Sequence, residues 1–250
     1  MPERVATRLH VPGGLASGAA VELARPQAHK LRHVLRLVPG ATVAAFNETA
    51  GEWLCELQYR DRSDAALIPL RQMRRPEAEA DLWLLFAPVK RARLDWLIEK
   101  ATEIGVAALL PVWTDRTQPE RLNRDRLRAI AIAAVEQSER LSVPEIREPA
   151  SLDRLIASWP AGRRLILCDE TGGGAPIAEA LQGSRPEQPA AIFVGPEGGF
   201  TDAELDALGK HPIVTRVGLG PRVLRAETAA LAALSAFQAI VGDWRRVRRR

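Results

Sequence analysis

Cysteine and long hydrophobic runs are scarce in this sequence. Only Cys55 and Cys168 occur among its 250 residues, with no CxxC pair and no histidine at ligand spacing from either. A disulfide framework is therefore excluded, and a zinc site has no support. Apolar runs such as "LAALSAFQAIV" fall short of the roughly 18 residues that cross a bilayer, and the N-terminus lacks a signal-peptide core. We expect a cytoplasmic protein.

An excess of charge of one sign is also missing. The chain has 35 basic and 31 acidic residues, and the arginines of the tail "WRRVRRR" account for the net charge of +4. The segment from Arg25 to Arg36 nevertheless contains Arg25, Lys30, Arg32 and Arg36 without an acid. Such a cluster suits the phosphates of a nucleic acid, and it equally suits a solvated charged face.

The composition is that of a folded protein, with 46% hydrophobic and 26% charged residues. Residues 1–72 contain short strand-like segments separated by Gly and Pro turns, together with one helical piece at about residues 29–37. This pattern predicts a small β-barrel. The polar stretch "RQMRRPEAEA" at residues 71–80 is the best linker candidate, so we predict a second domain over residues 73–250.

The second domain alternates strands with helices. The predicted strands are "DLWLLFAPV", "VAALLPVW", "RRLILCDE", "AAIFV" and "IVTRVGLG". Helix signals include Gly105 as a terminator, Ser151 as an N-cap, and Thr201 with Glu204 as a capping box. The last helix, at about 226–241, is apolar on nearly every side and is expected to be buried all round. The alternation predicts an α/β fold with a mostly parallel sheet, whose ligands lie beyond the carboxyl ends of the strands.

Two glycine loops follow predicted strands. The first is "GPEGG" at residues 195–199, and the second begins at Gly218 and leads through Arg225 and Glu227 into the last helix. Neither loop is a P-loop or a GxGxxG fingerprint. Glycines let the backbone approach a flat ligand closely, so we expect the two loops to face each other across one crevice. Glu227 suits a helix N-terminus without any function, whereas Arg225 needs an anionic partner.

With both loops in view, the sequence resembles the SPOUT methyltransferases and, among them, the RsmE family, which methylates N3 of a uracil in 16S rRNA. The resemblance is carried by "HVLRL", "EKATEIGV", "EQSERLSVPEI", "GPEGGF" and "LGPRVLRAETAAL". It implies an N-terminal PUA-like RNA-binding barrel and a C-terminal trefoil knot, which general topology rules disfavour. It also implies S-adenosylmethionine as the cofactor, 16S rRNA of the small ribosomal subunit as the partner, and a homodimer without metal.

The same resemblance implies site residues. Those expected to bind the cofactor are Gly195, Pro196, Glu197, Gly198, Gly199, Leu219, Gly220, Val223, Leu224 and Arg225. We expect Glu197 to act as the base or to orient the uracil, and Arg225 to stabilise negative charge. Lys90 is kept, but the glycine expected just after it is absent, which leaves its role open.

RNA phosphates are expected to contact Arg8, Arg32, Arg36, Arg116 and Arg140. His29 and His33 lie one helical turn apart and are expected to face RNA or to pack, since no third metal ligand is evident. The terminal arginines either touch RNA or form a solubilising tail. Two alternatives remain: a SPOUT enzyme acting on another RNA, or a catalytically silent RNA-binding assembly factor.

Overall fold

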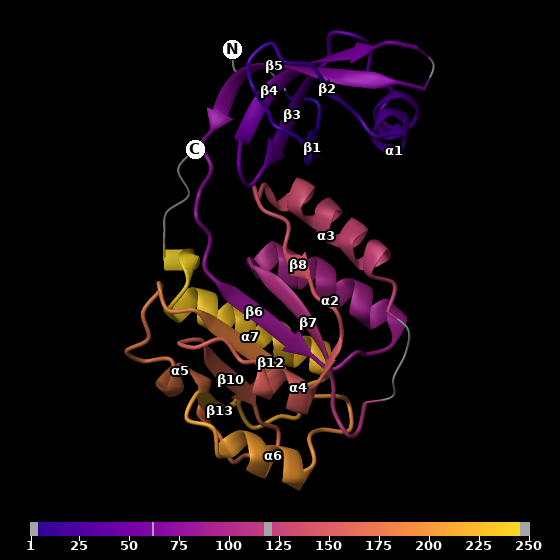
Figure 1. Ribbon diagram of the computed structural model, residues 1–250. Helices are drawn as coiled ribbons and strands as arrows, with labels where there is room; N and C mark the ends of the chain where they lie inside the picture. The colour runs from indigo at the N-terminus through magenta and orange to yellow at the C-terminus, as the bar shows by residue number, and fades with distance from the viewer. Residues whose placement is uncertain (1–4, 62, 118–121, 246–250) are drawn as a thin grey trace. The chain divides into compact units, whose positions relative to one another are not determined.

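The computed structural model describes residues 5–61, 63–117 and 122–245 (Figure 1). The chain forms two compact units. The first comprises Met1–Ala78 together with Val135–Val143, and the second comprises Glu79–Ala134 and Pro144–Arg250. The first unit is thus discontinuous in sequence, whereas the prediction placed one boundary between residues 72 and 73.

The first unit is built on a five-stranded sheet. Its elements are β1 (Arg8–His10), β2 (Val21–Glu22), α1 (Arg25–His29), the π-helical turn η1 (Lys30–Val34), β3 (Thr42–Asn47), β4 (Gly51–Tyr59) and β5 (Ala65–Arg74). The strand order is β1-β3-β4-β5-β2; β1 and β3 are parallel and the other pairs antiparallel. Alternate residues such as Val43 and Ala45, and Cys55 and Leu57, pack into one core.

Two boundaries in this unit differ from the prediction. β5 continues to Arg74, so the irregular segment begins later than residue 71. The helical piece begins at Arg25 and ends at Val34. Pro26 suits its first turn, because an N–H at this position would have no hydrogen-bond partner within the helix. Arg36 then adopts a left-handed conformation with φ of 53°, which ends the helical path.

The second unit contains the predicted parallel sheet. Its strands are β6 (Leu82–Phe86), β7 (Ala108–Trp113), β8 (Glu145–Ile146), β10 (Arg164–Cys168), β11 (Ala175–Pro176), β12 (Ala190–Val194) and β13 (Val214–Gly218). Their order is β11-β13-β10-β12-β6-β7-β8, every described pair is parallel, and the short β9 (Ala150–Ser151) pairs with β7. The central strands β6 and β12 are buried along their whole length, as expected for a sheet covered on both faces.

Helices cover both faces of this sheet. The helices that begin in the second unit are α2 (Arg91–Ile104), α3 (Arg124–Ser138), α4 (Leu152–Ala157), α5 (Ile177–Ala180), α6 (Asp202–Gly209) and α7 (Ala226–Ile240), followed by the 3₁₀ turn η2 (Asp243–Arg245). From Val135 on, α3 belongs to the first unit. α4 and α6 contribute to a core with Leu85 and Phe193. α2 and α7 lie side by side (Figure 1), and α7 contacts β12 and β6; neither helix contributes to that core among the described residues.

The predicted helix ends are confirmed where local chemistry sets them. Ser151 Oγ accepts a hydrogen bond from the Arg154 amide, and Thr201 and Glu204 form the capping box of α6. Gly105 ends α2 with φ of 107°, a conformation that favours glycine.

Helix α7 corrects one expectation. Only one side of it is buried in the chain, including Ala230, Ala233 and Leu234, whereas Ala232 and Ala239 are exposed. The helix is apolar on nearly every side, but the sheet and α2 cover only part of its circumference. Among the described residues, no helix has the length and apolarity needed to span a membrane.

Candidate active site

Three loops meet at the carboxyl ends of neighbouring strands in the second unit. β10 pairs with both β12 and β13, so the segments that follow these three strands leave the same edge of the sheet. Together they line a cavity of about 600 Å³. The prediction that two glycine loops share one crevice is thus confirmed, and a third loop joins them.

The loop after β12 is shaped by its glycines. A Cβ on Gly195 would lie 2.7 Å from the ring of Phe200, which is buried and packs edge-on against Phe193 with ring centroids 5.0 Å apart. Gly199 has φ of 70°, and its amide donates to the Pro196 carbonyl at 2.9 Å. The loop therefore needs glycine at both positions to turn tightly around the Phe200 ring.

Arg116 fixes this loop from outside. Its Nη1 donates to the carbonyl of Gly198 at 2.7 Å and to that of Phe200 at 3.3 Å. Gly195, Pro196, Glu197 and Gly199 line the cavity, but Gly198 does not. The carbonyl of Gly198 provides the anchor for Arg116, and its predicted contact with the cofactor stays a prediction.

The loop after β13 brings the second predicted set to the cavity. The residues of this set that line it are Leu219, Gly220, Val223, Leu224 and Arg225. Gly220 turns the chain with φ of 99°, and Val223 is 86% exposed. Arg225 caps α7, its carbonyl accepts from the Ala229 amide, and its exposed side chain forms no ion pair with a described residue. The guanidinium is therefore available to an anion.

The third loop, residues 168–172 after β10, was missed by sequence reasoning. It contributes Cys168, Asp169, Glu170, Thr171 and Gly172 to the cavity. The Glu170 carboxylate accepts from the Phe200 amide at 3.2 Å and thereby ties this loop to the one after β12. The signal available in the sequence was the glycine run "TGGG" directly after a predicted strand.

Asp169 anchors the third loop. Its side chain is completely buried; Oδ2 accepts two hydrogen bonds from Arg216, at 2.9 and 2.6 Å, and Oδ1 accepts from the Thr171 hydroxyl and amide. Burial opposes ionisation, but the bonds from Thr171 and then from Arg216 outweigh it and hold the pKa of Asp169 below its ordinary value.

A second missed residue is Arg93, at the start of α2. It lines the cavity, and its Nη1 forms an ion pair with Glu197 Oε1. Its Nε lies 3.6 Å from Oε1 of Glu227, in the first turn of α7. Glu227 is therefore more than a helix-terminal carboxylate, because it shares one arginine with the candidate base.

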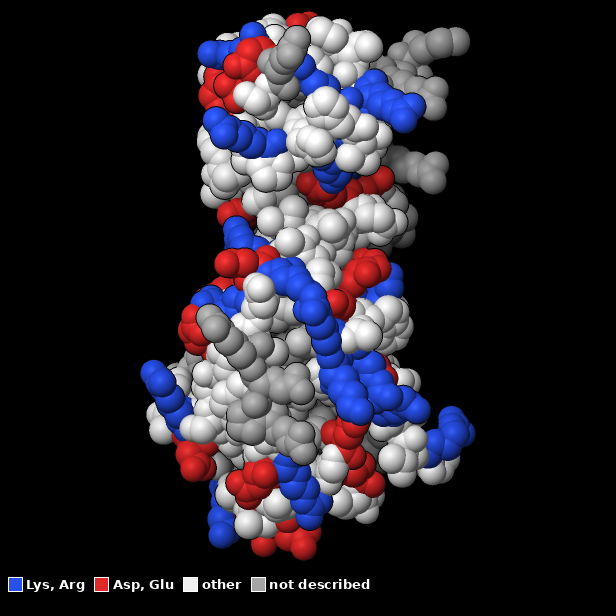
Figure 2. All heavy atoms as spheres, turned by 90° about the vertical axis from the view of Figure 1, so that its right-hand side faces the viewer, with Lys and Arg blue, Asp and Glu red and all other residues white. Residues whose placement is uncertain are grey.

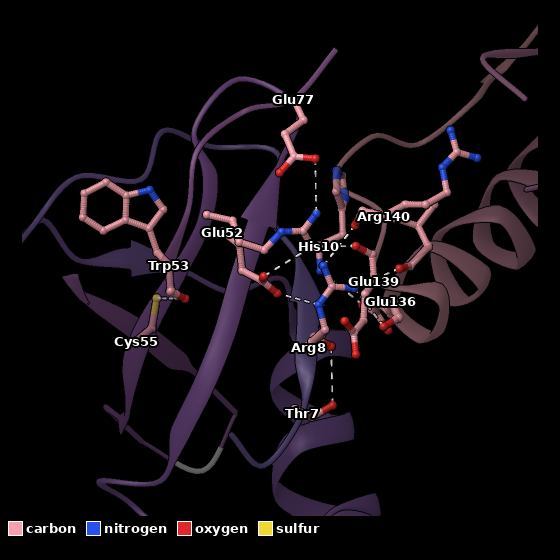
Figure 3. A network of polar contacts seen from close by, with 12 residues as sticks. Thr7, Arg8, His10, Glu52, Trp53, Cys55, Glu77, Glu136, Glu139 and Arg140 are labelled. Atoms are coloured by element: carbon pink, nitrogen blue, oxygen red, sulfur yellow. Dashed lines mark hydrogen bonds and ion pairs between the residues drawn. The ribbon is translucent and has the colours of Figure 1, made fainter. Parts of the chain in front are cut away.

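The predicted phosphate contact by Arg8 is wrong, because its guanidinium is already occupied. Figure 3 shows it among acceptors of the first unit: Nε donates to Glu52 at 2.6 Å, Nη1 to the carbonyls of Val135 and Glu136, and Nη2 to that of Arg140. The guanidinium also lies 4.1 Å from the centre of the Phe46 ring. Arg8 is therefore a structural residue, whose guanidinium binds backbone carbonyls at and just after the C-terminal end of α3.

Arg140 also departs from the expectation. Its side chain is buried and donates to Ser142 Oγ at 3.2 Å, and its backbone carbonyl accepts from Arg8 (Figure 3). A buried guanidinium cannot reach an RNA phosphate at the surface, so Arg140 belongs to the same internal network.

Arg32 and Arg36 remain at the surface of the first unit. Arg32 lies over the Tyr59 ring at 3.9 Å and donates to the Asp61 carbonyl at 2.5 Å, and Arg36 is exposed. Figure 2 shows one face on which basic and acidic side chains are interspersed rather than gathered into a single basic field.

The remaining candidates are His29, His33 and the two cysteines. His29 and His33 pack with ring centroids 4.8 Å apart, and within the described part of the chain no three His, Cys, Asp or Glu side chains form a metal-binding group. Both cysteines are free and buried. Burial raises the pKa of Cys55 to about 11; burial and then the Glu170 charge raise that of Cys168 to about 12. Residues 246–250 of the arginine tail lie outside the described residues.

Comparison with known proteins agrees with this geometry. Residues 76–238 match the model of the RNA methyltransferase domain family. Two relatives are the ribosomal RNA small subunit methyltransferases E of Rickettsia conorii, 30% identical over 91% of this chain and 93% of that protein, and of Bacillus subtilis, 31% identical over 84% and 86%.

Solved structures agree as well. The ribosomal RNA small subunit methyltransferase E of Neisseria gonorrhoeae, bound to S-adenosylmethionine, superposes with a TM-score of 0.84 at 27% identity and covers 95% of this chain and 99% of its own. A methyltransferase of Legionella pneumophila with the same bound cofactor gives 0.81 at 29% identity, covering 96% and 99%. With its glycine loops and its cavity at the expected strand ends, the chain belongs to the RNA methyltransferase family and, within it, to the ribosomal RNA small subunit methyltransferases E.

Proposed function

We propose that this protein transfers a methyl group from S-adenosylmethionine to N3 of a specific uridine in 16S rRNA of the small ribosomal subunit. The observation that carries the proposal is the cavity of about 600 Å³ at the carboxyl ends of β10, β12 and β13, to whose lining three acidic residues and three arginines contribute. This volume lies within the range of small-molecule sites.

The cavity suits the cofactor in both shape and charge. At Gly195 and Gly199 a Cβ would collide with Phe200 and Glu170, so the backbone itself forms that part of the wall and can approach a flat adenine closely. Glu170 offers a carboxylate to hydroxyl or ammonium groups of the cofactor. When bound, S-adenosylmethionine supplies a methyl group on a sulfonium, and the electrons of the broken C–S bond remain on sulfur.

The protein must make the uracil nucleophilic. N3 carries a proton at neutral pH, and its loss spreads negative charge over the two neighbouring carbonyl oxygens. Glu197 lines the cavity and takes this proton, while Arg225, whose side chain is exposed and forms no ion pair with a described residue, faces the developing charge.

Two measurements test this function. Mass-spectrometric mapping of rRNA nucleosides from cells that lack the protein should show one uridine of 16S rRNA without its N3 methyl group. Methylation of transfer RNA or of another rRNA site would favour the first alternative. With S-adenosylmethionine saturating, Glu197→Gln should abolish turnover; an unchanged rate would refute the assignment of the base.

The first unit, in this proposal, is a PUA-like RNA-binding domain in which Arg32 and Arg36 contact phosphates. Their double substitution by Ala should weaken RNA binding and reduce the slope of log K against log salt by roughly 0.7–0.9 for each lost contact. Arg154→Ala with Arg185→Ala removes the same charge from exposed positions of the second unit and is the matched control. Loss of S-adenosylmethionine binding in the Arg32 and Arg36 variant would contradict a dedicated RNA face.

We further propose a trefoil knot, a homodimer and a cytoplasmic location. The exposed Ala232 and Ala239 of the apolar helix α7 favour a second copy as its cover. After β13 the chain enters α7, and α7 then packs against β12 and β6, which is compatible with a knotted path.

A catalytically silent assembly factor is disfavoured by the intact glycine loops. Calorimetry with S-adenosylmethionine separates an enzyme, which binds the cofactor, from such a factor.

A further inference from the structure

One arginine at the cavity is shared by two carboxylates of very different exposure. Arg93 pairs through Nη1 with Glu197, whose side chain is 49% exposed, and approaches Glu227, whose side chain is 11% exposed, through Nε at 3.6 Å. The three side chains come from α2, from the loop after β12 and from α7. Arg93 and Glu197 are 104 residues apart in the sequence, and the fold brings their charges together.

Glu227 has an unused oxygen. Its Oε2 is buried, and none of the described donors reaches it. An unpaired buried carboxylate oxygen is costly for a folded protein, and such a group is commonly retained for function. The described cation that forms an ion pair with Glu227 is Arg93, and with Oε2 unused Glu227 has the capacity to accept more from Arg93 than it does in the present arrangement.

We propose that Glu227 is a positioning residue for the methylation reaction, acting as the second counter-ion of Arg93. The inference rests on Glu197 being the base. In this arrangement the N3 proton moves to a Glu197 oxygen, the N–H bonding pair stays on the uracil, and Glu197 becomes neutral. Arg93 then transfers its pairing to Glu227 and stays at the cavity wall, where it faces the anionic uracil.

The physical reason is the cost of neutralising one partner of an ion pair. If Arg93 had Glu197 as its sole counter-ion, protonation of Glu197 would forfeit the whole attraction between them. A second carboxylate that remains ionised compensates for part of this loss. Arg93 suits this exchange because a guanidinium presents several donors in a fixed plane and can contact two carboxylates, whereas an ammonium is a single compact charge.

The test compares Glu227→Gln with Glu103→Gln. Gln keeps the size of the side chain at residue 227 but removes the charge. Glu103 pairs with Lys100 on the same helix as Arg93 and lies away from the cavity lining, so its variant controls for the loss of an ordinary ion pair. We expect Glu227→Gln to lower kcat roughly tenfold, with an unchanged KM for RNA and an unchanged calorimetric Kd for S-adenosylmethionine, and Glu103→Gln to leave kcat unchanged.

Two further measurements separate this role from a structural one. Glu227→Gln should unfold at the same urea concentration as the parent chain, because it removes a charge that is incompletely paired. Arg93→Lys should lower kcat to a similar degree, and the double variant Arg93→Lys with Glu227→Gln should be no slower than the slower single one, since both break the same exchange.

Parental kcat in Glu227→Gln would overturn the inference, as would a loss of kcat matched by a lower urea midpoint, or additive losses in the double variant. The base assignment fails by a different result, namely full activity of Glu197→Gln. If Glu197→Gln is inactive while Glu227→Gln keeps parental activity, the proposed function stands and only the exchange of counter-ions is refuted.

Discussion

Alanine substitution at three glycines should separate the roles of the backbone and of the cavity wall. Gly209 ends helix α6, has no left-handed conformation and has open space where a Cβ would stand. Gly220 also has open space but a φ of 99°, and Gly199 has both a φ of 70° and a Cβ site 2.0 Å from Glu170 Oε1. The series adds one physical cost at a time.

The magnitudes follow from these differences. Gly209→Ala should raise the free energy of unfolding by about 0.5 kcal/mol, because alanine loses less backbone entropy on folding. Gly220→Ala should lower it by about 1 to 2 kcal/mol through left-handed strain alone. Gly199→Ala adds the displacement of the Glu170 carboxylate from the Phe200 amide, about 1 kcal/mol more.

Urea unfolding and calorimetry with S-adenosylmethionine check the series. In urea, the expected order from the most to the least stable is Gly209→Ala, the parent chain, Gly220→Ala and Gly199→Ala. Gly199→Ala should also bind the cofactor roughly tenfold more weakly, because it moves both the loop and Glu170. A Gly199→Ala variant with the stability and affinity of Gly209→Ala would refute the role of the loop.

Three other predictions concern the loops around the cavity. The pKa of Asp169 is lowered in the folded chain, so its contribution to the free energy of unfolding is complete above the ordinary pKa of 3.8 and is lost as pH falls through the lower native pKa. Asp169→Asn should therefore lower the free energy of unfolding, measured in urea, by about 2 to 3 kcal/mol at pH 7 and by much less near pH 2. A difference that does not depend on pH would contradict the role of its charge. Arg116→Ala should weaken S-adenosylmethionine binding roughly fivefold in calorimetry, because two loop carbonyls lose their donor, and unchanged affinity would show that the loop is rigid without it. Cys168, with a pKa raised to about 12, should resist iodoacetamide at pH 7.5 in the native chain, and mass spectrometry that found labelling as fast as for a free thiol would refute its burial.

The sequence supported those predictions whose causes are local. The caps at Ser151 and at Thr201 with Glu204 are decided within a few residues, and both occur as predicted. The glycine loops could be assigned to one cavity because the carboxyl ends of parallel strands share an edge. The predicted burial of α7 was too extensive, because the sequence shows how apolar a helix is and not how much of its surface the rest of the chain covers.

The missed residues depend on long-range contacts. Arg8 looked like a free surface cation, but its acceptors Glu52 and Val135 are 44 and 127 residues away, and no local pattern reveals them. Arg93 lacked any signal for the same reason, since its partner Glu197 follows 104 residues later. Glu170 could have been predicted from the sequence, because a predicted strand followed by a glycine run marks a loop at the same edge of the sheet.

A crystal structure of the protein soaked with S-adenosylmethionine tests the central claim most directly. Density for the cofactor should lie in the cavity between residues 168–172, 195–200 and 219–225, with Gly199 and Gly220 against it. Cofactor density at another place, or a cavity that stays closed to it at saturating concentration, would contradict the account.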